Sequence, residues 1–151
     1  MKNGEFCNRE VVVAEKDAAI VDLARLMRQY HTGDIIVVDN TGGKTIPIGI
    51  ITDRDIILKI VAEGIPVNSV TAGDIMSPVL HTVNENSSIW STFEMMQAKG
   101  IRRIPVINDQ HELQGILTAD DVLEIIAEET AALAKVFKQE QIVETKRIKP
   151  F

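Results

Sequence analysis

The chain has 151 residues, enough for one compact unit or for two very small units that share a core, because an isolated unit below about 60 residues buries too little surface. Hydrophobic residues make up 45% and charged residues 25%, which indicates a folded globular protein and excludes a disordered one. The net charge of −6, from 16 Lys and Arg against 22 Asp and Glu, predicts neither a nucleic-acid partner nor a membrane partner.

The amino-terminal stretch MKNGEFCNRE lacks the apolar core of a signal peptide, and no apolar run approaches the roughly 20 residues that cross a bilayer. A cytoplasmic protein is therefore predicted. Cys7 is the only cysteine, which excludes an internal disulfide and a site with several thiolate ligands. His31, His81 and His111 lack the spacing of metal ligands, and none accompanies a plausible nucleophile, so we predict no metal site and no enzyme activity.

Two halves of the chain repeat each other. Residues 11–27 align with residues 80–96 at an offset of 80 − 11 = 69, and residues 35–38 align with 104–107 at the same offset. The stretches GIITDRDII, from Gly49, and GILTADDVL, from Gly115, align at 115 − 49 = 66. The second copy is therefore shorter between its apolar runs, where a length change belongs in a hairpin loop.

The first copy predicts, in chain order, a strand at 11–13, an amphipathic helix, two strands and a second helix. Asp17 is the candidate cap of the first helix, whose apolar face begins at Ile20, and Gly33 is its stop signal. The two strands are predicted at 35–39 and 46–52, and the second helix begins after Thr52.

The second copy follows a connector at 64–78 and repeats the same order of elements. Its strands are predicted at 80–83, 103–107 and 113–118; its first helix is capped by Asn86 and ended by Gly100, and its second begins after Thr118. Each copy is an α+β unit of the order β-α-β-β-α that cannot cover its own sheet on both faces, so the copies should pack as one module. The predicted boundaries are repeat 1 at 5–63, a linker at 64–78 and repeat 2 at 79–127.

A helical stripe of apolar residues continues past the second copy. It predicts that the last helix extends into a carboxy-terminal helical extension and tail at 128–151, and it needs an apolar partner. A second subunit in a homodimer would supply that partner, and docking on the chain's own module is the alternative. The stripe consists of Val122, Ile126, Leu133, Val136 and Phe137.

The doubled motif, with IMSP before the second copy and RRIPVI at its middle strand, resembles a tandem pair of cystathionine β-synthase (CBS) domains, called a Bateman module. The resemblance covers about residues 5–127. It implies two repeats related by a pseudo-twofold axis, with clefts between them that bind adenosine-containing ligands. AMP, ADP, ATP, S-adenosylmethionine and NAD are the candidates. The implied role is regulatory, with an unidentified regulated protein as a further partner.

The repeated Thr-x-x-Asp places Thr52 or Thr118 at a helix cap and Asp55 or Asp121 in its first turn, beside free amide N–H groups. Such a helix start suits a phosphate, and a carboxylate one sugar away can accept both hydrogen bonds of a ribose diol. A capping box without any ligand is the alternative interpretation of the same residues.

Basic residues are distributed unevenly between the copies. By the resemblance, Arg102 and Arg103, at the turn into a middle strand, hold phosphate; the first copy has Gly33 and Asp34 at those positions. Arg54 also contributes, whereas its counterpart Asp120 is acidic. We therefore expect two clefts of different affinity. The alternative for the arginine pair is a solvated strand edge that protects against aggregation.

Adenine is expected between apolar walls, for which family position suggests Val11, Ile35, Val79 and Ile104, with ordinary core packing as the alternative. The leading hypothesis is a regulatory module that binds an adenine nucleotide and changes shape or partner affinity. The rival hypothesis is a scaffold without ligand that dimerises or docks to a partner enzyme.

Overall fold

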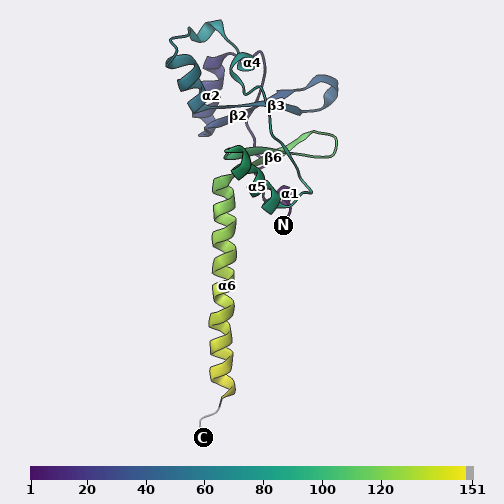
Figure 1. The fold of residues 1–151 in the computed structure, drawn as a ribbon, viewed down its shortest axis with the longest axis vertical. Coiled ribbons are helices and arrows are strands. Elements are labelled where there is room, and N and C mark those ends of the chain that lie inside the picture. Colours follow the sequence, from purple (N-terminus) through teal and green to yellow (C-terminus); the bar gives the residue numbers. More distant parts are fainter. Residues whose placement is uncertain (149–151) are drawn as a thin grey trace.

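A computed structural model of the chain describes residues 1–148 and shows two three-stranded sheets, helices around them, and one long carboxy-terminal helix (Figure 1). In each sheet the middle strand pairs parallel with the first strand and antiparallel with the third. The strands are β1 (Val13–Glu15), β2 (Asp34–Asp39) and β3 (Ile46–Thr52) in the first repeat, and β4 (Val83–Asn84), β5 (Arg103–Ile107) and β6 (Leu113–Thr118) in the second. The predicted α+β class is confirmed.

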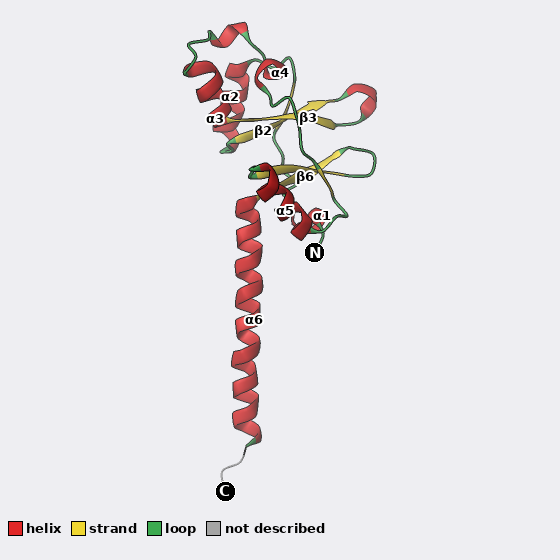
Figure 2. Cartoon of the chain, viewed as in Figure 1, coloured by secondary structure: helices red, strands yellow, loops and turns green. Residues whose placement is uncertain are grey.

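Helices occupy most of the remaining chain, as Figure 2 shows in red. The α-helices are α1 (Asn3–Phe6), α2 (Ile20–Tyr30), α3 (Asp53–Ile56), α4 (Ala72–Ile75), α5 (Ile89–Lys99) and α6 (Ala119–Arg147). A π-helical turn, η2 (Ile57–Val61), continues α3, and two 3-10 turns, η1 (Thr41–Gly43) and η3 (Val67–Ser69), lie in connections.

The two repeats are equivalent in three dimensions at the offsets seen in the sequence. Helix α5 starts 89 − 20 = 69 residues after α2, and α4 starts 72 − 3 = 69 residues after α1. The middle strands carry the same bulge, after Val37 in β2 and after Val106 in β5. The repetition of sequence is therefore a repetition of structure, and it allows residues to be compared position by position.

The short helices α1 and α4 are exchanged between the repeats. Helix α1 comes first in the chain but packs on the second repeat, where Gly4 N–H donates to Glu85 O at 2.9 Å. Helix α4 packs on the first repeat, where Gly73 N–H donates to Lys16 O at 2.7 Å. Figure 1 shows α1 beside α5 and α4 above β3. The segment 64–78 thus contributes a helix to the first core, and each repeat is completed by residues that precede the other.

Three hydrophobic clusters hold the module together. Two of them lie between a sheet and its helices. Every second residue of a strand points into these clusters, as Ile35 and Val37 of β2 do. The third cluster lies between the sheets, where Ile36 and Val38 pack with Ile116 of β6. Both faces of each sheet are buried in this way, which explains why the middle strands are continuously apolar rather than alternating.

Helix boundaries differ from the prediction where backbone geometry overrides residue type. Helix α2 ends at His31, which adopts the left-handed conformation with φ 50°, two residues before the predicted Gly33. Gly100 occupies the equivalent position after α5 with φ 63°, as predicted. The caps are Ala19 and Ser88 rather than Asp17 and Asn86, because Asp17 and Asn86 lie in tight turns that precede the helices.

Helix α6 confirms the predicted carboxy-terminal extension over the described residues; the last three residues of the range 128–151 lie outside them. Its first turns pack on the second core through the buried Val122, whereas every residue from 126 to 142 is exposed. Figure 1 shows the helix standing clear of both repeats. Most of the predicted apolar stripe therefore has no partner within residues 1–148.

Two glycines of the repeated motif lie under the exchanged segments, and they differ in what approaches them. A Cβ atom at Gly115 would lie 2.6 Å from the backbone oxygen of Asn8, whereas one at Gly49 would lie 2.5 Å from Sδ of Met76. We expect Gly115→Ala to lower the free energy of unfolding by about 1–3 kcal/mol, and Gly49→Ala by less, because a thioether rotates away more easily than a backbone moves. Urea denaturation measures both, and the opposite order would contradict this explanation.

Candidate functional site

The repeated Thr-x-x-Asp closes a capping box in both repeats. Asp55 Oδ2 accepts hydrogen bonds from Thr52 N–H at 2.8 Å and from Thr52 Oγ1 at 3.1 Å, while Asp55 N–H donates to Thr52 Oγ1 at 3.2 Å. The corresponding distances for Thr118 and Asp121 are 3.0, 2.7 and 3.1 Å. These residues therefore fix the start of α3 and of α6, as the capping interpretation requires.

The second carboxylate oxygen distinguishes the two aspartates. Oδ1 of Asp55 lies 3.4 Å from Nζ of Lys59 in the next turn. No side chain or backbone group within residues 1–148 donates to Oδ1 of Asp121. Asp121 consequently keeps one oxygen that can accept hydrogen bonds from a ligand after its capping bonds are made.

A third box of the same type occurs outside the repeated motif. Asp74 Oδ2 accepts from Thr71 N–H at 2.8 Å and from Thr71 Oγ1 at 3.2 Å, at the start of α4. Asp74 is exposed. A capping box by itself is therefore no sign of a ligand site, and Asp74 provides an internal control for Asp55 and Asp121.

A cavity of about 300 Å³ lies between the repeats next to Thr118, and we call it the Thr118 cleft. It brings together three predicted site residues, Val11, Thr118 and Asp121, from opposite repeats. A neighbouring hollow of about 560 Å³ shares Glu10, Val11, Val12 and Tyr30 with it. The lining of the Thr118 cleft consists of Asn8, Glu10, Val11, Val12, Tyr30, His31, Thr32, Asp34, Ile116, Thr118 and Asp121. Small-molecule sites occupy this range of volume.

Several residues of this lining were missed in the sequence. Tyr30 and His31 enter because α2 ends at the cleft, and Asp34 because β2 begins there. The repeat offset provided a signal for one of them, since 34 + 69 = 103 makes Asp34 the counterpart of the predicted Arg103. The lining contains three carboxylates, those of Glu10, Asp34 and Asp121, and no Lys or Arg.

Arg103 and Asp34 form an ion pair across the repeats, with 2.7 Å between Nε and Oδ2. Their side chains are 35% and 15% exposed, so water screens the pair only in part. Because the two positions are equivalent under the repeat, the pair joins the repeats at their pseudo-twofold axis. Arg102 instead pairs within its own repeat, at 3.2 Å from Asp120, and both of those side chains are more than 70% exposed, at 71% and 74%.

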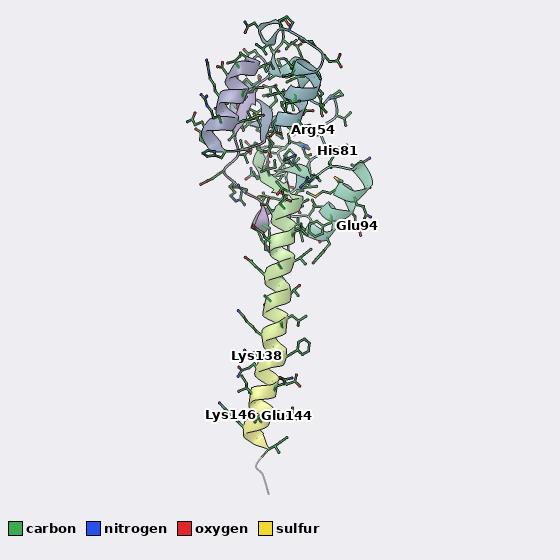
Figure 3. All side chains as sticks on the ribbon, turned by 90° about the vertical axis from the view of Figure 1, so that its left-hand side faces the viewer. Arg54, His81, Glu94, Lys138, Glu144 and Lys146 are labelled. Atoms are coloured by element: carbon green, nitrogen blue, oxygen red, sulfur yellow. The ribbon has the colours of Figure 1, made fainter. Side chains whose placement is uncertain are left out.

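The remaining predicted residues lie in three settings. Arg54 is exposed in the first turn of α3, and Figure 3 shows it on the same side of the molecule as His81, where the repeats meet. Val79 is 65% exposed. Ile35 and Ile104 are completely buried in the two repeat cores, because their strand parity points them away from the other sheet. These two isoleucines offer no surface for an adenine, and core packing accounts for them.

The CBS domain family profile matches this chain twice, at residues 4–62 and 72–128. The chain belongs to the CBS domain family. Each match begins in one of the exchanged helices, α1 or α4; the first match ends just after η2, and the second ends within α6. The chain is therefore a tandem CBS pair, as its sequence predicted.

Relatives and solved structures share this organisation. An uncharacterized protein of Methanopyrus kandleri is 37% identical over 122 residues, covering 81% of this chain and 61% of the relative, so the chain spans about six-tenths of that protein. Hypoxic response protein 1 of Mycobacterium tuberculosis is 30% identical, covering 78% of this chain and 80% of the relative. A CBS domain protein from Pyrobaculum aerophilum complexed with AMP superimposes with a TM-score of 0.72 at 25% identity, covering 80% and 89% of the two chains. A hexameric CBS-CP12 protein from bloom-forming cyanobacteria superimposes with a TM-score of 0.70 at 27% identity. The match covers 82% of this chain and 69% of the cyanobacterial chain.

Burial raises the pKa of the Cys7 thiol, an effect that Arg9 only partly opposes, so the unreactive thiol predominates over the thiolate at neutral pH. Residues 1–148 contain no group of three His, Cys, Asp or Glu side chains placed to hold a metal ion. Over the same residues, none of the helices, including α6, combines the length and apolar character needed to cross a bilayer.

The Asp34–Arg103 pair should contribute to the stability of this CBS pair. In a double-mutant cycle of Asp34→Asn and Arg103→Met, we expect a coupling free energy of about 1–2 kcal/mol, decreasing as salt is raised, because the pair is largely shielded from water. The exposed pair Arg102–Asp120, replaced in the same way, is the control and should give about 0–0.5 kcal/mol. Urea denaturation at low and high salt measures both, and equal coupling in the two pairs would show that burial at the axis adds nothing.

Proposed function

We propose that this CBS pair is a regulatory module that binds an adenosine-containing ligand, such as AMP, ADP or ATP, between its repeats. The Thr118 cleft carries the proposal of an adenosine site, because both repeats form it and because Asp121, which keeps one carboxylate oxygen after its capping bonds, lines it at a helix start. The AMP complex of the Pyrobaculum relative supports the class of ligand. S-adenosylmethionine and NAD contain the same adenosine group and belong to the same class.

The residues of the cleft suit the parts of such a ligand. Oδ1 of Asp121 accepts hydrogen bonds from the ribose diol, and the half-buried Val11 provides an apolar surface for the base. Thr52, Arg54 and Asp55 offer the equivalent helix start in the first repeat, with Arg102 and Arg103 as sources of positive charge near the axis. Phosphate binding at helix starts follows from their unpaired N–H groups and positive dipole end.

The position of the cleft links ligand binding to the exposed helix α6. A ligand that contacts both repeats favours the arrangement of the repeats in which all of its contacts are made. Thr118 and Asp121 also form the first turn of α6, a helix of 29 residues. At about 1.5 Å per residue, α6 reaches roughly 40 Å beyond the cleft. A small rotation of its start is therefore amplified at its far end, where a regulated protein or a second subunit would detect it.

Helix α6 also favours an assembly role, which is the second candidate function. We propose that a second copy of the chain covers it, forming a homodimer around Leu133 and Phe137, which are 57% and 60% exposed. Its charges suit an antiparallel partner, since residues 120–129 carry only acidic charges and residues 135–147 mostly basic ones. The acidic residues are Asp120, Asp121, Glu124, Glu128 and Glu129, and the basic ones are Lys135, Lys138, Lys146 and Arg147. A scaffold that only dimerises would need α6 and no ligand.

Ligand binding should depend on the aspartates of the repeated motif. Any compound that binds the native state raises the midpoint of thermal unfolding, so AMP, ADP, ATP, NAD and S-adenosylmethionine are screened first by thermal shift. With the best ligand, we expect Asp55→Ala and Asp121→Ala each to weaken binding at its own site by about 1–3 kcal/mol, through loss of a charged acceptor. Isothermal titration calorimetry measures the affinities.

Asp74→Ala is the matched control, because it removes the same capping box without touching the repeated motif. It should lower stability and leave affinity unchanged. If all three variants bind like the wild type, the motif serves only as a helix cap. If no ligand shifts the unfolding midpoint, the scaffold function is favoured instead.

The dimer should depend on the apolar face of α6. Changing Leu133 and Phe137 together to Glu should shift the mass measured by light scattering from dimer toward monomer, because charges would replace the buried contact. Ala127→Glu with Ala131→Glu adds the same charges to the opposite face of the helix and should leave the dimer intact. A wild-type protein that is monomeric at micromolar concentration would disprove the assembly.

A further inference from the structure

Each residue that lines the Thr118 cleft has an equivalent in the other repeat, and the repeat offset identifies it. These equivalents surround Thr52. The two halves keep Thr and Asp of the motif, since 118 − 66 = 52 and 121 − 66 = 55. The register of the strands confirms the equivalence, because Thr52 pairs with Asp34 as Thr118 pairs with Arg103. We call the surface around Thr52 the Thr52 side. Differences between the two surfaces can therefore be attributed to individual substitutions.

Three of these substitutions change charge, each in the same direction. Adding 69 to the lining residues replaces Glu10 by Val79, Tyr30 by Lys99 and Asp34 by Arg103. A fourth replaces Val12 by His81. Relative to the Thr118 cleft, the Thr52 side thus loses two carboxylates and gains two permanent cations.

The Thr118 cleft is acidic in the folded structure as well as in composition. Asp34 and Asp121 are partly buried in its lining, and the exposed Glu10 lies at the same cavity. Asp34 has Arg103 as a partner, 2.7 Å away, but Arg103 is outside the lining and is balanced by that carboxylate. A phosphate in this cleft would therefore meet the carboxylates of Glu10 and Asp121, and the lining contains no Lys or Arg to compensate them.

The Thr52 side carries positively charged side chains instead. Lys99 is exposed at the end of α5, beside the left-handed Gly100, and Arg54 is exposed in the first turn of α3. Within residues 1–148, neither side chain has a carboxylate at ion-pair distance. Arg103 uses Nε for Asp34, and the other two guanidinium nitrogens have no partner there. These cations can bind an anionic group at the start of α3.

We infer that the two surfaces select adenosine derivatives by charge: the Thr118 cleft takes those with a neutral or cationic 5′ substituent, and the Thr52 side takes those with a 5′ phosphate. The inference rests on the proposed function, since it assumes that adenosine compounds bind between the repeats. The module would then bind two different ligands rather than two molecules of the same ligand. The Asp34–Arg103 pair separates the two surfaces, because each of its members contributes its charge to a different one.

The two surfaces are separated experimentally with the aspartate variants. Asp55→Ala leaves the Thr118 cleft intact, and Asp121→Ala leaves the Thr52 side intact. Calorimetric titrations use adenosine, AMP and S-adenosylmethionine, whose 5′ substituents are neutral, anionic and cationic. In Asp121→Ala we expect AMP to bind roughly tenfold or more tightly than adenosine, with the preference falling as salt rises. In Asp55→Ala we expect adenosine and S-adenosylmethionine each to bind more tightly than AMP.

Substitutions that raise the affinity of the Thr118 cleft for AMP test whether charge causes the selectivity. In the Asp55→Ala background, Glu10→Gln with Tyr30→Lys gives two of the three charge-changing positions of the Thr118 cleft the charge of their counterparts and leaves the Asp34–Arg103 pair in place. We expect the affinity for AMP to rise roughly tenfold while that for adenosine stays constant. The control, Glu94→Gln with Gln97→Lys, makes the same change in net charge on exposed residues of α5; Figure 3 labels Glu94 on the second repeat, below the junction where Arg54 and His81 lie. It should leave AMP affinity unchanged.

The outcomes distinguish this inference from the proposed function. If adenosine compounds bind and the ratio of AMP to adenosine affinity is the same in both aspartate variants, the charge selection is wrong and the proposed function stands. An equal gain in the α5 control would also overturn the inference, because net charge rather than position would be responsible. If no adenosine compound binds the wild-type protein, the proposed function and the inference both fail.

Discussion

The two sheets cover each other, and the rest of the module depends on this contact. A three-stranded sheet with helices on one face leaves the other face apolar, and here Ile36 and Val38 of one sheet pack with Ile116 of the other. The exchange of α1 and α4 strengthens the arrangement, because each repeat core contains a helix that precedes the other repeat. Neither repeat is complete alone, so a cleft formed by both responds to anything that changes their relative position.

The contact between two units of equivalent fold places equivalent residues opposite one another at the axis. If the residues at 34 and 103 were the same, two like charges or two neutral groups would meet there. The chain instead has Asp34 and Arg103, which attract each other at 2.7 Å. This pair makes the module asymmetric, since it stabilises one pairing of the repeats and divides positive from negative charge between the two surfaces.

Thr118 and Asp121 connect the cleft to the exposed part of the protein. Their hydrogen bonds define the start of α6, and the same helix carries the apolar residues outside the module. Thr52 and Asp55 have no such extension, because α3 runs into the π-helical η2 and ends after a few turns. The two motifs are therefore chemically alike but structurally unequal, because the motif at Thr118 begins the helix that extends beyond the module.

The sequence by itself determined the two repeats, the order of their elements, the capped Thr-x-x-Asp motifs and the long last helix. All of these follow from local patterns: a period of two or of about 3.6, turn residues and caps. Only the tertiary structure decided that Ile35 and Ile104 belong to the cores, that α1 and α4 change places, and that Asp34 and Glu10 line the Thr118 cleft. These features depend on contacts between residues far apart in the chain, such as 34 and 103, and on which face of a strand meets the other sheet. Local propensity contains no information about either.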